Sequence, residues 1–201
     1  AGAYRDERIN RIFEGTNEVN RLIIGGYTLK KSILEELPIR DLISSIPNQW
    51  SRDIELDESL PKLEANVIEF SRTALAYILN QCINEFGQDL KNEQWVIEPL
   101  SNSIISLCIM DTTFKRFKNV NMESKKSDQL INILSLSVYQ QYSSLIRNIQ
   151  KIAMYLDRNR EISISEVIER QIKTLAYSCD EISLKKLIIA DFYKNGKYYL
   201  D

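Results

Sequence analysis

A glutamate, a glycine and a threonine follow one another near the start of the chain, at Glu14, Gly15 and Thr16. Two apolar residues, Ile12 and Phe13, precede the glutamate. Burial beside apolar side chains disfavours the charged carboxylate and raises its pKa, which suits a general base that accepts a proton near neutral pH. Gly15 has no Cβ atom, so the backbone can turn sharply there or approach another group closely. These residue types predict a carboxylate positioned for proton abstraction.

A helix is predicted to begin directly after this glycine. Thr16 is a plausible N-cap, because its hydroxyl can accept a hydrogen bond from a backbone N–H of the first turn. Glu18 then lies in that first turn, where the helix dipole favours a negative charge. Val19, Leu22 and Ile23 recur at the spacing of one apolar helix face.

These residues belong to a longer run that resembles a known family. From Tyr4 to Leu22 the sequence has the pattern Tyr-Arg-Asp-x-Arg-Ile-x-x-Ile-Phe-Glu-Gly-Thr-Asn-Glu-x-x-Arg-Leu, which resembles the C-terminal signature of the acyl-CoA dehydrogenases. A glutamate that merely precedes a helix is the alternative for Glu14. The match at polar as well as apolar positions favours the family interpretation. The resemblance implies that Glu14 removes the α-proton of an acyl-CoA thioester while the β-hydride passes to a flavin, and that Gly15 lies beside the thioester.

The same resemblance implies a cofactor and partners. It places Thr16, Asn17 and Glu18 at contacts to the adenine part of FAD, although not every family member has a glutamate at position 18. It further implies an acyl-CoA substrate, a flavoprotein that accepts electrons, and a homo-oligomer.

Composition bounds the class of protein. The 201 residues include 44% apolar and 27% charged residues with a formal net charge of −2, which is typical of a globular protein and lacks the basic excess of a nucleic-acid surface. No histidine is present, which excludes histidine catalysis and histidine metal ligands, and we expect no metal. Three cysteines without a close pair indicate reduced thiols and a cytoplasmic protein. The chain begins inside a motif, so we expect a fragment.

The elements that position the motif are predicted to be helices. Only six glycines and four prolines interrupt long stretches of helical period, which favours an all-α helical bundle of four long helices plus shorter ones. We expect close helix–helix contact at the glycine pair Gly25 and Gly26, and a kink or break before Pro99. The segment from Leu100 to Met110 is expected to be the most buried. Helices are predicted over residues 17–37, 39–45, 60–87, 92–118, 127–156, 165–179 and 183–194.

A second, weaker resemblance concerns the remainder of the chain. The sequence Asn92-Glu93-Gln94-Trp95 and the apolar helix after it are similar to the helical domain appended to very-long-chain-type acyl-CoA dehydrogenases. This implies a catalytic-glutamate segment with the last helix of the dehydrogenase C-terminal domain at residues 1–37, a linker at 38–57 and an appended helical domain at 58–201. Such a fragment is expected to be inactive alone. The alternative is a non-catalytic helical module for interaction, oligomerisation or membrane docking.

Overall fold

The computed structural model describes residues 9–12, 15–39, 41–44, 61–120, 127–159 and 163–195. All regular structure in these ranges is helical, which confirms the all-α prediction. The elements, in chain order, are η1 (Ile9–Arg11), α2 (Asn17–Ile33), α4 (Lys62–Phe86), η2 (Gly87–Asn92), α5 (Gln94–Asn119), α6 (Ser127–Leu156), η3 (Asp157–Asn159), α7 (Ile164–Leu175) and α8 (Glu181–Asn195). Ile39 and residues 41–44 are also helical, and the amide of Leu42 donates to Pro38 O at 3.2 Å.

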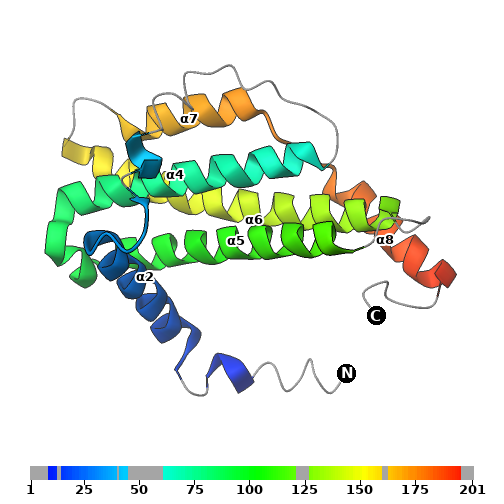
Figure 1. The fold of residues 1–201 in the computed structure, drawn as a ribbon, viewed down its shortest axis with the longest axis horizontal. Coiled ribbons are helices and arrows are strands. Elements are labelled where there is room, and N and C mark those ends of the chain that lie inside the picture. Colours follow the sequence, from blue (N-terminus) through cyan, green and yellow to red (C-terminus); the bar gives the residue numbers. More distant parts are fainter. Residues whose placement is uncertain are drawn as a thin grey trace.

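Three long helices, α4, α5 and α6, lie alongside one another and form the centre of the bundle (Figure 1). α5 packs most extensively on α6, and α4 packs on both. α2 crosses α5 near its N-terminal end, whereas α7 and α8 pack on α6. A stripe of apolar side chains, spaced three or four residues apart along α6, is buried at every position: Leu130, Leu134, Val138, Tyr142, Leu145, Ile149, Ile152 and Leu156.

The segment from Leu100 to Met110 was predicted to be the most buried, and this prediction is wrong for the described residues. Within the segment from Leu100 to Met110, Cys108 and Ile109 are exposed. The core instead draws heavily on α4, where Val67, Ala74 and Ile78 are fully buried. α5 is contacted by α6, α4 and α2 on part of its circumference, so the remaining side faces solvent.

The structure differs from the prediction at Pro99 and at the end of α7. α5 runs through Pro99 without a break. Pro99 is in the second turn, so only the first turn loses a backbone hydrogen bond. α7 ends at Leu175 rather than Cys179, because Ala176 adopts the left-handed conformation with φ 45°. Gly87, with φ 54°, ends α4 as predicted.

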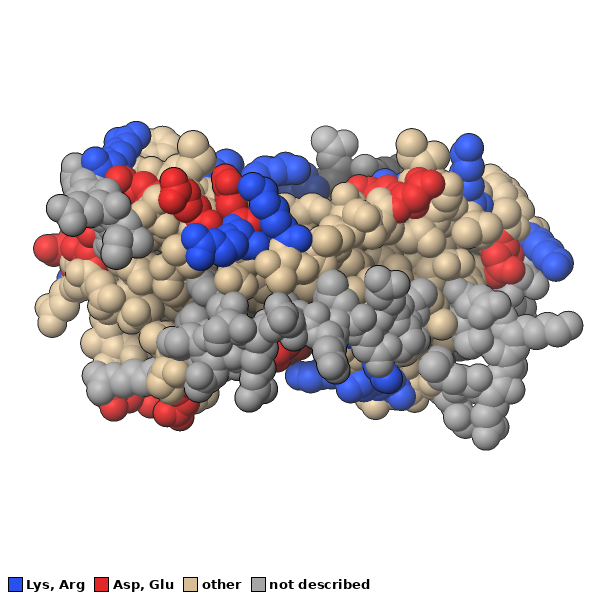
Figure 2. Space-filling view, turned by 90° about the horizontal axis from the view of Figure 1, so that it is seen from above, with Lys and Arg blue, Asp and Glu red and all other residues tan. Residues whose placement is uncertain are grey.

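Charges are mixed on the surface. Figure 2 shows Lys and Arg side chains beside Asp and Glu on the face that it views. This distribution fits the near-neutral formal charge of −2 and the absence of a basic excess in the sequence.

Candidate functional site

The glycine of the opening motif has a conformation that few other residues adopt. Gly15 has φ 103°, and a Cβ atom added to it would lie 3.0 Å from Asn20 Oδ1. The Asn20 side-chain amide donates a hydrogen bond to Gly15 O at 3.1 Å. This bond joins Gly15 to α2. Phe13 and Glu14 lie outside the described residues. The residue before the N-cap of α2 thus has a backbone conformation that favours glycine.

Thr16 begins the helix in the predicted way. Its hydroxyl accepts a hydrogen bond from the Val19 amide at 3.3 Å, and its carbonyl accepts one from the Asn20 amide at 2.9 Å. Asn17 is the first residue of α2, and Glu18 lies in the first turn. A hydrogen bond to its own backbone amide, together with one from Thr16, lowers the pKa of the exposed Glu18 carboxyl. The Thr16, Asn17 and Glu18 side chains therefore stand together at one accessible helix end.

Only part of the apolar face predicted for α2 packs against the core, and the rest is exposed to solvent. Leu22 packs against the core, whereas Val19 is exposed and Ile23 is 61% exposed. Tyr27 continues the exposed strip one turn further along α2, and Ile12 is exposed before it. An exposed apolar strip of this kind is typical of a surface that another protein surface covers.

α2 is held on α5 by polar contacts as well as by apolar packing. The Arg21 guanidinium donates through Nε to Asn102 Oδ1 at 2.6 Å. Ser101 Oγ lies 2.6 Å from Arg21 O and 2.8 Å from Ile97 O, so its single proton is shared between two carbonyls. Gly25 is buried at this crossing. These contacts position the helix that carries Thr16, Asn17 and Glu18. The close contact at Gly25 was expected from the glycine pair, whereas the hydrogen bonds of Arg21 to Asn102 and Ser101 join residues about eighty positions apart and were not identifiable from local sequence.

A second polar cluster lies inside the bundle. Glu64, in the first turn of α4, is 1% exposed, and its Oε1 accepts a hydrogen bond from Ser135 Oγ at 2.6 Å. Among the residues that the structure describes, neither its Oε2 atom nor the Tyr142 hydroxyl has a hydrogen-bond partner. Tyr177 donates to Ser135 O at 3.4 Å and packs edge-on against Tyr142. Burial raises the pKa of Tyr142 to about 12, and burial followed by the nearby Glu64 charge raises the pKa of Tyr177.

Other kinds of site receive no support from the part of the chain that the structure describes. No group of three or more His, Cys, Asp or Glu side chains there could hold a metal ion. Among those same residues, none of the helices has the length and apolar run needed to traverse a bilayer. Cys82, Cys108 and Cys179 are free thiols.

Comparison with known proteins finds similarity to acyl-CoA dehydrogenases. No protein-family model matches the chain. A probable acyl-CoA dehydrogenase of Bacillus subtilis (strain 168) is 28% identical over 116 residues. A crystal structure of an acyl-CoA dehydrogenase from Bacillus anthracis, complexed with FAD, matches 98% of the chain with a TM-score of 0.84 and 20% identity. The resemblance to the acyl-CoA dehydrogenases is confirmed.

The matches also show how much of such an enzyme is present. The 116-residue match spans 57% of this chain and 20% of the Bacillus subtilis relative. The structural match spans 34% of the Bacillus anthracis protein. The bundle of this chain therefore has the fold of about one third of a solved acyl-CoA dehydrogenase, and the helices after residue 60 have counterparts there as well as α2.

Proposed function

We propose that this chain is the C-terminal part of a flavin-dependent acyl-CoA dehydrogenase, an oxidoreductase that forms the α,β double bond of acyl-CoA thioesters in fatty-acid β-oxidation. The observation that carries the proposal is the family motif at residues 4–22, attached to a bundle that matches an acyl-CoA dehydrogenase over 98% of its length. Motif and fold are separate observations, and they point to the same family.

In the proposed reaction Glu14 acts as the general base. Its carboxylate takes the proton from Cα of the thioester, and the electron pair of that C–H bond forms the new double bond as a hydride leaves Cβ. FAD, when bound, supplies the acceptor for this hydride. Gly15 contributes a turn with φ 103° and no side chain, which allows close approach of the thioester to the backbone.

The start of α2 suits contact with a polar group of FAD. The Thr16 hydroxyl accepts from Val19 N and donates to the Glu18 carboxylate, so it holds that carboxylate at the start of the helix. Asn17 offers an amide with both donor and acceptor atoms, and Glu18 offers a carboxylate acceptor beside it. The three residues form one edge of a binding site, so the remaining contacts have to come from other parts of the enzyme.

The proposal divides the chain as the motif suggests. Residues 1–37 provide the catalytic glutamate and the last helix of the dehydrogenase domain, 38–57 act as a linker, and 58–201 form an appended helical domain. The substrate is an acyl-CoA, and the electrons pass to a flavoprotein acceptor. Because one edge of the cofactor site cannot hold a flavin, the chain alone is expected to be inactive.

The decisive experiment replaces Glu14 by glutamine in the full-length enzyme. The amide has nearly the same shape but cannot accept a proton, so turnover should fall by at least ~10²–10⁴-fold while flavin content is retained. Glu169→Gln, at an exposed position of α7, is the matched control and should leave turnover unchanged. If the Glu14 variant keeps more than half of the wild-type turnover, Glu14 is not the base.

The alternative class, a helical interaction module, is favoured by one specific feature of the same chain. The exposed Trp95 side chain stands at a hollow between α5 and α6, which is also lined by Asn102, the hydrogen-bond partner of Arg21. This feature is compatible with the enzyme assignment, because an appended domain can carry an interaction surface.

A further inference from the structure

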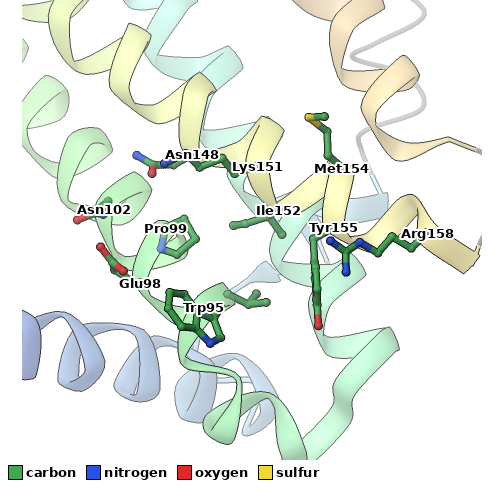
Figure 3. A pocket seen from close by; sticks show the side chains of 11 residues that line it. Trp95, Glu98, Pro99, Asn102, Asn148, Lys151, Ile152, Met154, Tyr155 and Arg158 are labelled. Carbon is green, nitrogen blue, oxygen red and sulfur yellow. The ribbon is translucent and has the colours of Figure 1, made fainter.

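A polar contact between Arg21 of α2 and Asn102 of α5 joins the motif helix to the bundle. Arg21 Nε donates to Asn102 Oδ1 at 2.6 Å, and the contact is partly buried. A hydrogen bond from a charged donor is stronger than one between neutral groups. Asn102 stands on α5 beside the hollow of about 700 Å³ that separates the first turns of α5 from the last turns of α6 (Figure 3). The Asn102 amide therefore holds the Arg21 side chain against α5.

The backbone of α2 is attached to α5 at the same level. Ser101 Oγ lies 2.6 Å from Arg21 O. Gly25 packs so closely on Ser101 and Ile97 that an added Cβ atom would be 2.6 Å from Ser101 Oγ. Among the elements that the structure describes, α5 is the one on which α2 mainly packs. The short stretch of α5 from Ile97 to Asn102 thus determines where α2 lies.

Arg21 is also close to the end of α2 that is proposed to meet FAD. It comes five positions after Thr16 and three after Glu18, so about one helix turn separates it from that end. The pKa of the Glu18 carboxyl is lowered by a hydrogen bond to its own backbone amide, by one from Thr16 and, to a smaller extent, by the Arg21 charge. The Arg21 guanidinium therefore interacts with Glu18 along α2 and with Asn102 across to α5.

We propose that Asn102 is a positioning residue for the FAD site and that it acts through Arg21. The bond between them opposes rotation of α2 about its own axis, and such a rotation would turn Thr16, Asn17 and Glu18 away from the cofactor together. Asn102 belongs to the helical domain that follows the linker, so that domain supports cofactor binding without contacting the cofactor. The proposal rests on the proposed function, because contact of α2 with FAD is part of it.

The first experiment measures the FAD dissociation constant of the full-length apoenzyme by the change in flavin fluorescence. Asn102→Leu has a side chain of similar size without the acceptor, and it should raise the dissociation constant ~10-fold, the usual effect of losing one hydrogen bond to a charged group. Asn102→Asp keeps the shape and the acceptor and should bind FAD as tightly as the wild type. Asn119→Leu, at the exposed far end of α5, is the matched control and should also bind FAD normally.

A further variant separates positioning from stability. Ser135→Ala removes a hydrogen bond between α4 and α6, in a part of the bundle that does not hold α2. It should destabilise the enzyme and leave the FAD dissociation constant unchanged. If Ser135→Ala weakens FAD binding as much as Asn102→Leu does, loss of stability explains the effect and the proposal is wrong.

A double-mutant cycle tests whether Asn102 acts through Arg21. In an Arg21→Leu background the bond is already absent, so Asn102→Leu should raise the FAD dissociation constant no further. Additive losses in the double variant would show that Asn102 acts by another route.

Two more results would overturn the proposal. These are wild-type FAD affinity in Asn102→Leu, and a loss in Asn102→Asp as large as that in Asn102→Leu. Both leave the proposed function standing, because the wild-type enzyme still binds the flavin. A full-length wild-type enzyme that binds no FAD would instead overturn the proposed function, and the role of Asn102 with it.

Discussion

Gly25 lies against Ser101 so closely that no side chain fits between α2 and α5 at their crossing. A Cβ atom on Gly25 would be 2.6 Å from Ser101 Oγ and 2.7 Å from Ile97 Cγ2. The neighbouring glycine, Gly26, has open space at the same position, with nothing within 4 Å of an added Cβ. The pair Gly25-Gly26 therefore contains one glycine that permits helix contact and one that does not take part.

This difference predicts opposite effects for the two alanine variants. Gly25→Ala should destabilise the fold by ~1–3 kcal/mol, since it forces apart a packed contact. Gly26→Ala should stabilise it by ~0.5–1 kcal/mol, since alanine is the better helix former and costs nothing in packing. Urea unfolding midpoints of the two variants measure both effects. Equal midpoints would show that the crossing adjusts without cost.

Because the Glu64 carboxylate is buried, we predict that loss of the Ser135 hydroxyl lowers the free energy of unfolding. Ser135→Ala removes the hydroxyl that donates to Glu64 Oε1 and leaves both carboxylate oxygens without a partner. The loss should be ~1–3 kcal/mol, the typical cost of a buried polar group left unsatisfied. Ser137→Ala, two positions further along α6, is the control and should change stability by less than ~0.5 kcal/mol. The free energies of unfolding of the two variants decide the matter, and a Ser135 loss no larger than that of Ser137 would contradict the prediction.

Asp157 predicts a pH dependence at the start of α7. Its carboxylate accepts hydrogen bonds from the Ile164 amide at 2.6 Å and the Ser165 amide at 3.0 Å. Burial alone would raise the pKa of Asp157, but the hydrogen bonds from Ser165, Ile164 and Ser163 outweigh it and lower the pKa. A lowered folded-state pKa contributes stability above the unfolded value of about 3.9, and this contribution is lost as the pH falls through the folded-state value.

The variant Asp157→Asn tests this expectation. At pH 7 it should be less stable than the wild type by ~0.5–2 kcal/mol, the range found for helix caps. The difference should shrink as the pH is lowered below about 4, where the wild-type carboxyl also becomes protonated. Asp89→Asn, at an exposed position of η2, is the control. A difference that is constant between pH 7 and pH 3 would show that charge at Asp157 does not contribute.

A flavin-binding measurement tests the prediction that this chain alone does not hold FAD. The purified 201-residue chain should be colourless and should show no acyl-CoA oxidation, because Thr16, Asn17 and Glu18 form only one edge of a flavin site. Absorbance between about 370 and 450 nm after incubation with FAD and desalting is the measurement. A stoichiometric flavin spectrum in the desalted protein would contradict the expectation.

The helices were predictable where the sequence pattern is local and continuous. The bounds predicted for α6, Ser127 to Leu156, are those observed, because apolar residues recur every three or four positions without interruption. The Thr16 cap and the turn at Gly15 were likewise predictable from residue type alone. The end of α7 was not, because an alanine takes the left-handed conformation there and no glycine marks the position.

Contacts between distant segments could not be predicted in the same way. Arg21 and Asn102 are 81 positions apart, and Glu64 and Ser135 are 71 positions apart. Nothing in the sequence around Glu64 distinguishes it from an exposed helical glutamate, since its burial results from the packing of α6 on α4. The hollow at Trp95 was missed for a related reason. Lys151 of α6 and Arg158 of η3 line it together with Trp95 only because α5 packs alongside α6 (Figure 3).

A tilt of α2 about its contact with α5 at Gly25 would move the N-terminal end of α2. Gly25 is nine positions after Thr16, so at about 1.5 Å per residue the two are roughly 13.5 Å apart along the helix. A tilt of only about 5° at the crossing would move the Thr16 end by about 1 Å, a displacement that can cost an enzyme ~10²-fold in rate. In the full-length enzyme, Gly25→Ala should therefore slow turnover more than Gly26→Ala does, although both glycines come more than ten positions after Glu14 in the sequence. Equal turnover of the two variants would show that tilting at this crossing is not transmitted to the motif.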